Sequence, residues 1–109
     1  MTGAQERALR ELWPALGIES SEEPLDFAAA FGRDAPVVLE IGFGNGESLV
    51  ALAYSHPERN YLGLEVHPPG VGHLLLCCEA GQLGNVRVIC DDAVQVLQRR
   101  VPDASLDEV

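Results

Sequence analysis

The chain has 109 residues, which is enough for one small domain. A hydrophobic fraction of 47% is ordinary for a globular protein and too high for an intrinsically disordered one. The 17 acidic and 7 basic residues give a net charge of −10, which opposes contact between these residues and nucleic-acid phosphates.

The sequence shows no signal for export or membrane insertion. The longest apolar run, residues 49–54, is far shorter than the roughly 20 residues that span a membrane. The first residues lack the basic region and apolar core of a secretory signal. Cys77, Cys78 and Cys90 have no metal-ligand spacing and are expected to be free thiols. We therefore expect a cytoplasmic protein that contacts no membrane and binds no metal.

Residues 1–34 are predicted to form an N-terminal helix and linker. Thr2, with a glutamine three residues later, has the pattern of a capping box at a helix start. Pro14 should kink or end that helix, because proline cannot continue the backbone hydrogen bonding. Residues 19–24 are a polar linker, and residues 26–31 allow one helical turn before a glycine ends it.

Residues 35–109 alternate between strand and helix patterns and are predicted to form a second unit. The predicted strands are residues 36–41, 60–66 and 86–90. The predicted helices are residues 47–55, residues 71–83 after a loop at 67–70, and a segment capped by Asp92. Residues 106–109 have the pattern of the start of a fourth strand. This alternation indicates a three-layer α/β fold with a partial parallel sheet in strand order 3-2-1.

A glycine loop follows the first predicted strand and contains Gly42, Gly44 and Gly46. Glycines at this place let the backbone turn tightly and approach a ligand closely. Glu40 and Glu47 flank the loop, and carboxylates there would repel the pyrophosphate of a dinucleotide. S-adenosylmethionine instead brings a sulfonium and an ammonium, and a charge pair at about 4 Å is worth about 4 kcal/mol near a protein surface. The loop therefore favours S-adenosylmethionine as the cofactor.

Three further acids lie near the ends of predicted strands. Glu65 lies about twenty residues past the loop, where nucleotide-binding folds place an acid that accepts hydrogen bonds from ribose hydroxyls. Asp91 and Asp92 follow the third strand, where an acid can accept from the adenine amino group. Asp92 can also serve simply as a helix N-cap, and one side chain can do both.

Several segments, in the correct order, resemble the bacterial tRNA (guanine-N7)-methyltransferases. The matching segments are residues 38–46, 62–67, 69–72, 85–88, 92–93 and 96–97, with further similarity at 13–17 and 25–33. The resemblance implies a Rossmann-like methyltransferase fold and a cofactor site made by Glu40, Gly42, Gly44, Gly46, Glu65 and Asp92. It also implies methyl transfer from S-adenosylmethionine to N7 of a guanosine in the tRNA variable loop.

The sequence departs from this family in two respects, and one is that the basic arm that usually precedes the family's first helix has no match here. The family's Pro-Asp-Pro-Trp segment and the basic stretch beyond it, which supply the residues taken to act at guanine and to contact tRNA, have no match here. We therefore expect a fragment with no nameable catalytic residue, inactive alone and prone to self-association through an exposed strand edge. The alternatives are a nucleotide-binding or regulatory module without methyl transfer, or a catalytically silent interaction domain. Arg99 and Arg100 are expected to be a solvated helix end.

Overall fold

The computed structural model describes residues 1–101 of the chain. The three strands are β1 (Val37–Ile41), β2 (Asn60–Leu64) and β3 (Val86–Ile89). The six helices of the described residues are α1 (Gly3–Glu11), α2 (Trp13–Leu16), α3 (Phe27–Phe31), α4 (Glu47–Ser55), α5 (Pro68–Gly81) and α6 (Ala93–Arg99). The predicted fourth strand at 106–109 lies outside the described residues.

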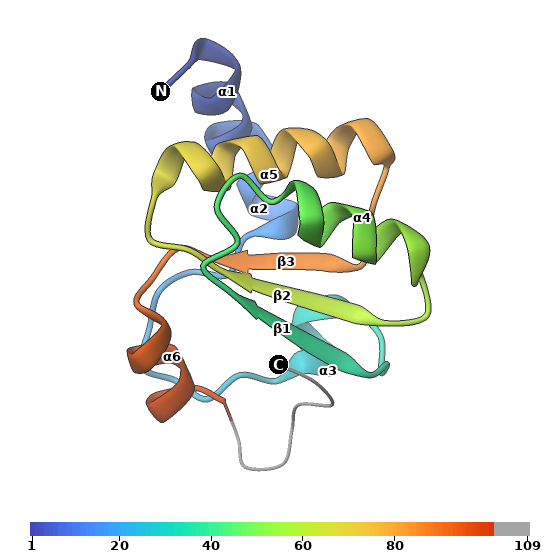
Figure 1. Cartoon of the computed structure of the whole chain (residues 1–109). Helices are drawn as coiled ribbons and strands as arrows, with labels where there is room; N and C mark the ends of the chain where they lie inside the picture. Colours follow the sequence, from blue (N-terminus) through green and yellow to red (C-terminus); the bar gives the residue numbers. More distant parts are fainter. Residues whose placement is uncertain (102–109) are drawn as a thin grey trace.

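The strands form one parallel sheet in the order β1-β2-β3, which confirms the predicted strand order. Glu40 of β1 lies beside Gly63 of β2, and Gly63 lies beside Val88 of β3. All five residues of β2 are buried, as expected for a central strand covered on both faces. Because the strands are parallel, their carboxyl ends meet at one edge of the sheet (Figure 1).

Helices cover both faces of the sheet, which confirms the predicted three-layer α/β fold (Figure 1). On one face, α1, α2, α4 and α5 contribute to a core with Val38, Tyr61, Val86 and Val88. On the other face, α3 and α6 contribute to a second core with Val37, Leu39, Leu62, Leu64 and Ile89. The alternating strand residues thus divide between two apolar layers.

The N-terminal residues share these cores. Ala8 of α1 is fully buried, and Arg7 pairs with Glu79 of α5 at 2.8 Å. Farther along, Gly17 forms a parallel bridge with Val88, so the N-terminal chain lies along the outer edge of β3. The helix start at Thr2 is the predicted capping box. No helix of residues 1–101 is long and apolar enough to cross a membrane.

Two predicted boundaries in the middle of the chain are wrong. Strand β2 ends at Leu64 rather than at residue 66, because Val66 donates its N–H to the carboxylate of Glu65 instead of a neighbouring strand. Helix α5 begins at Pro68, inside the predicted loop. Proline is favoured in the first helical turn, where its missing N–H costs no hydrogen bond.

Candidate cofactor site

The glycine loop joins the end of β1 to the start of α4. Gly42, Gly44 and Gly46 have φ values of 65°, 66° and 83°, in the left-handed region that favours glycine. A Cβ at Gly46 would lie 2.5 Å from Cδ1 of Leu74, so this glycine is required for packing as well. A Cβ at Gly42 or Gly44 would meet no protein atom within 4 Å. The space over these two residues is therefore open to a ligand.

Two other glycines allow the loop to pack closely against its neighbours. A Cβ at Gly63 of β2 would lie 2.7 Å from the ring of Phe43, because this ring folds back onto the sheet. A Cβ at Gly70 of α5 would lie 2.2 Å from the carbonyl oxygen of Gly44. Sequence reasoning placed Gly70 in a loop and missed this contact, since nothing local indicates which backbone it approaches.

Glu65 lies directly after β2, and its carboxylate accepts hydrogen bonds from the protein backbone. Oε1 accepts from the N–H of Gly44 at 2.8 Å, and Oε2 accepts from the N–H of Val66 at 2.8 Å. Burial alone would raise the pKa of Glu65, but the backbone N–H groups of Gly44, Val66 and His67 outweigh it and lower the pKa. The predicted ribose acceptor is thus an ionised carboxylate that also fixes the glycine loop.

Asp91 and Asp92, which follow β3, have different environments. Asp92 is exposed, and its Oδ1 accepts from the N–H of Gln95 at 3.1 Å, which confirms that it caps α6. Asp91 is half-buried, with Oδ1 accepting from the N–H of Asp92 at 2.7 Å and Oδ2 accepting from the hydroxyl of Ser20 at 2.6 Å. The hydrogen bond from Ser20, followed by that from the backbone, lowers the pKa of Asp91.

A cavity of about 160 Å³ lies at the carboxyl ends of the strands, next to α6. Its lining residues are Ile41, Gly42, Leu64, Glu65, Val66, Asp91 and Ala93. The walls are mostly apolar, and the two carboxylates come from the ends of neighbouring strands. An apolar slot flanked by two hydrogen-bond acceptors suits a flat, weakly polar group that carries donors.

The cavity gathers some of the predicted site residues and leaves out others. Gly42 and Glu65 line it, and Gly44 is bonded to Glu65. Glu40, half-buried near the end of β1, is not among the lining residues of the described chain, and neither is Asp92. The remaining glycine, Gly46, is buried against α5.

A second cavity, of about 320 Å³, lies on the other side of the glycine loop. It is lined by Gln5, Gly44, Asn45, Glu47, His67, Pro69, Gly70 and His73. Oδ1 of Asn45 accepts from the N–H of Glu47 at 3.0 Å, which forms a side-chain turn just before α4, whose N-cap residue is Gly46. A larger hollow, of about 460 Å³, lies at the opposite edge of the sheet, around Arg33, Tyr54 and Asn85. Ligands of open parallel sheets bind at the carboxyl ends, which makes the glycine-loop edge the candidate site for a cofactor.

The methyltransferase family model described as "Putative methyltransferase" matches residues 34–109. This chain belongs to that methyltransferase family. Membership implies S-adenosylmethionine as the methyl donor. The matched region contains the whole glycine loop, Glu65 and both acids after β3.

Curated relatives extend the match to the N-terminal residues. A protein named tRNA (guanine-N(7)-)-methyltransferase from Edwardsiella ictaluri is 57% identical over 109 residues, covering 100% of this chain and 46% of the relative. Proteins of the same name from Alkalilimnicola ehrlichii and Klebsiella pneumoniae are 59% and 56% identical, each over 100% of this chain and over 47% and 46% of their own length. The resemblance stated from the motifs is confirmed. The chain spans less than half the length of these relatives.

Proposed function

We propose that these residues form the cofactor-binding half of a tRNA (guanine-N7)-methyltransferase. The observation that carries the proposal is the identity of 54–59% to proteins of that name, over the whole chain and its glycine loop. No second function has a comparable observation in its favour. An enzyme that modifies tRNA would act in the cytoplasm, in line with the location expected from the sequence.

The residues at the glycine-loop edge fit S-adenosylmethionine. The backbone at Gly42 and Gly44 is open, because a Cβ at either residue would meet no atom within 4 Å, so a ligand can approach it closely. Glu65 has lone pairs left for the ribose hydroxyls after its bonds to the backbone, because a carboxylate accepts about four hydrogen bonds. Glu40 and Glu65 supply negative charge, which suits a cationic ligand and opposes a diphosphate.

The chemical role proposed for these residues is to position the methyl donor. When bound, S-adenosylmethionine supplies an electrophilic methyl group. Guanine N7 is already nucleophilic and carries no proton, so no general base is needed on these residues. Methyl transfer requires that the donor be aligned with N7, and a glycine loop fixed by the hydrogen bond from Gly44 to Glu65 offers a rigid surface for it.

The tRNA-binding surface is assigned to the part of the relatives that this chain does not span. The charge of −10 repels a polyanion and contributes no counterion release. Among the described residues no catalytic side chain is proposed, in line with the expectation from the sequence.

The test is methyl transfer to unmodified tRNA from radiolabelled S-adenosylmethionine. The 109-residue chain is compared with a chimera that continues after Val109 with the remaining residues of the Alkalilimnicola ehrlichii relative. We expect labelling of guanine N7 by the chimera and none by the chain alone. A chimera that binds the cofactor and tRNA but labels another atom or another nucleic acid would refute the proposed substrate.

We also propose that the chain self-associates. Strand β1 lies at the edge of the sheet order β1-β2-β3, and an edge strand can pair with a strand of another chain; Ile41 on β1 is also 44% exposed. Light scattering over a hundredfold range of concentration should show a mass that rises with concentration. A constant monomer mass would contradict this proposal and leave the assignment of the enzyme intact.

A further inference from the structure

The segment of residues 18–25, which we call the strap, is a fixed part of the structure rather than a loose linker. At its start, Ile18 donates its N–H to the carbonyl of Val88 on β3 at 2.8 Å. At its end, Leu25 is buried and donates its N–H to the carbonyl of Arg100 at 2.7 Å. The strap thus spans from the edge of β3 to the end of α6.

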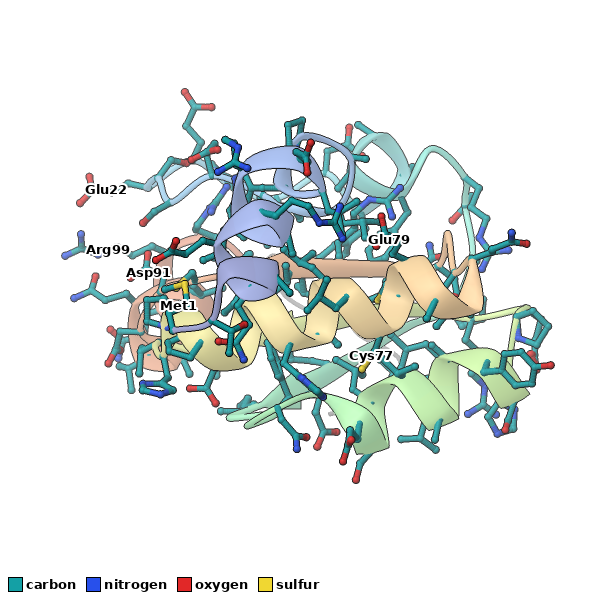
Figure 2. The ribbon with its side chains drawn as sticks, turned by 90° about the horizontal axis from the view of Figure 1, so that it is seen from above. Met1, Glu22, Cys77, Glu79, Asp91 and Arg99 are labelled. Atoms are coloured by element: carbon teal, nitrogen blue, oxygen red, sulfur yellow. The ribbon has the colours of Figure 1, made fainter. Side chains whose placement is uncertain are left out.

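Arg100 holds the middle of the strap. Its side chain is only 6% exposed, and it donates to the carbonyl of Glu19 at 2.9 Å and to the carbonyl of Glu23 at 2.9 Å. Beside it, Arg99 pairs with Glu22 on the surface. Figure 2 shows Glu22, Arg99 and Asp91 near one another at one end of the molecule. A buried guanidinium with two carbonyl partners leaves the strap little freedom to move.

The strap touches the cofactor cavity through one side chain. Ser20 donates its hydroxyl hydrogen to Oδ2 of Asp91 at 2.6 Å, and Asp91 lines the cavity together with Glu65. The other oxygen of Asp91 accepts from the N–H of Asp92. The carboxylate is therefore held from two sides, one of which is the strap, and each oxygen keeps a lone pair for a ligand.

We propose that Ser20 is a positioning residue for cofactor binding, which acts by holding Asp91 and the Asp91–Asp92 turn against the base of S-adenosylmethionine. This inference rests on the proposed function, because it takes the cavity ligand to be the cofactor. Glu65 and Asp91 both line this cavity, from the ends of neighbouring strands, so a nucleoside with its ribose at Glu65 can present its base to the turn. The amino group of adenine is the hydrogen-bond donor that an aspartate there would accept.

In this role, the N-terminal strap contributes to the selection of the base. A purine with a carbonyl oxygen in place of the amino group presents an acceptor at the position where adenine presents a donor, and a carboxylate facing that oxygen is repelled by it. The hydroxyl of Ser20 should therefore strengthen the binding of an adenine ligand and leave the binding of the hypoxanthine analogue unchanged. A merely structural role would affect both ligands alike.

The test uses Ser20→Ala in the full chain, with Ser20→Thr as the conservative rescue and Ser21→Ala as the matched control. The hydroxyl of Ser21 accepts only from the N–H of Glu23 among the described residues, at 3.2 Å. Circular dichroism first establishes that all variants are folded. Calorimetry then measures the affinity of each for S-adenosylhomocysteine and for S-inosylhomocysteine.

We expect Ser20→Ala to bind S-adenosylhomocysteine about three- to tenfold more weakly, the effect of one lost hydrogen bond. Ser20→Thr and Ser21→Ala should stay within about twofold of the parent, and the inosyl analogue should bind parent and Ser20→Ala equally. Titration by NMR should show the pKa of Asp91 raised in Ser20→Ala, since the hydroxyl that donates to its carboxylate is gone.

Two results would overturn the inference. One is an unchanged affinity of Ser20→Ala for S-adenosylhomocysteine, and the other is an equal loss for both ligands. If the parent chain binds neither ligand, the proposed function fails and this inference fails with it. In that case the NMR titration still reports whether Ser20 contacts Asp91, so the two failures are told apart.

Discussion

Glu65, at the end of β2, accepts a hydrogen bond from the backbone N–H of Gly44 at 2.8 Å, which ties the second strand to the glycine loop. The same carboxylate accepts from the N–H of Val66 and lines the cavity at the strand ends. The acid proposed to accept hydrogen bonds from the ribose therefore also shapes the loop beside which we propose that the cofactor binds. Removing it should affect the loop and the ligand together.

Glu65→Ala should weaken the binding of S-adenosylhomocysteine by about 1–3 kcal/mol, the cost of leaving partner groups without a charged acceptor. Glu65→Gln should lose less, because its amide oxygen still accepts from one N–H. Calorimetry on both variants checks that the affinity of Glu65→Gln lies between that of the parent and that of Glu65→Ala. Glu58→Ala, at the opposite edge of the sheet, is the control and should bind as the parent does. Equal effects of Glu58→Ala and Glu65→Ala would show that Glu65 is only a surface carboxylate.

Gly70→Ala should disturb the glycine loop without altering any charged group. The added Cβ would lie 2.2 Å from the carbonyl oxygen of Gly44, and a backbone atom cannot move aside as a flexible side chain can. We expect a loss of about 1–3 kcal/mol in the free energy of unfolding and weaker cofactor binding. Gly84→Ala, whose Cβ would meet nothing within 4 Å, should change the stability by less than about 1 kcal/mol. Urea unfolding of the two variants measures whether the close approach of Gly70 to Gly44 contributes to stability; equal losses in both would show that it does not.

The free energy of unfolding should fall in acid because the carboxylates of Glu65 and Asp91 become protonated. Both carboxyls have a pKa lowered in the folded chain, so their stabilising contribution is present above the unfolded-state pKa values of about 4. It is lost as the pH falls through the lowered folded-state values. Urea midpoints from about pH 7 to about pH 3 should therefore fall more steeply for the parent than for Glu65→Gln. Parallel curves would show that Glu65 makes no such contribution.

Local signals predicted much of the fold correctly. Thr2 caps α1, residues 47–55 form α4, and the three glycines of the loop take positive φ values, because each feature depends on neighbours in the sequence. The helix break expected at Pro14 lies earlier, because α1 ends at Glu11 and Pro14 lies in the first turn of α2, a position where proline is compatible with a helix.

What the sequence could not show depends on contacts between distant residues. Arg100 was expected to be solvated, yet it is buried beneath the strap and bonded to a carbonyl 81 positions earlier. Ser20 reaches Asp91 across 71 positions. Neither contact follows from periodicity or capping patterns, because both require knowing that the strap lies beside α6.

The most direct test of the account is calorimetry of the unmodified chain with S-adenosylhomocysteine and with NAD. The carboxylates of Glu40 and Glu65 and the open backbone at Gly42 and Gly44 suit the first ligand and repel the diphosphate of the second. We expect measurable binding of S-adenosylhomocysteine and none of NAD in the same range of concentration. Equal or tighter binding of NAD would contradict the assignment of this edge of the sheet as a methyl-donor site.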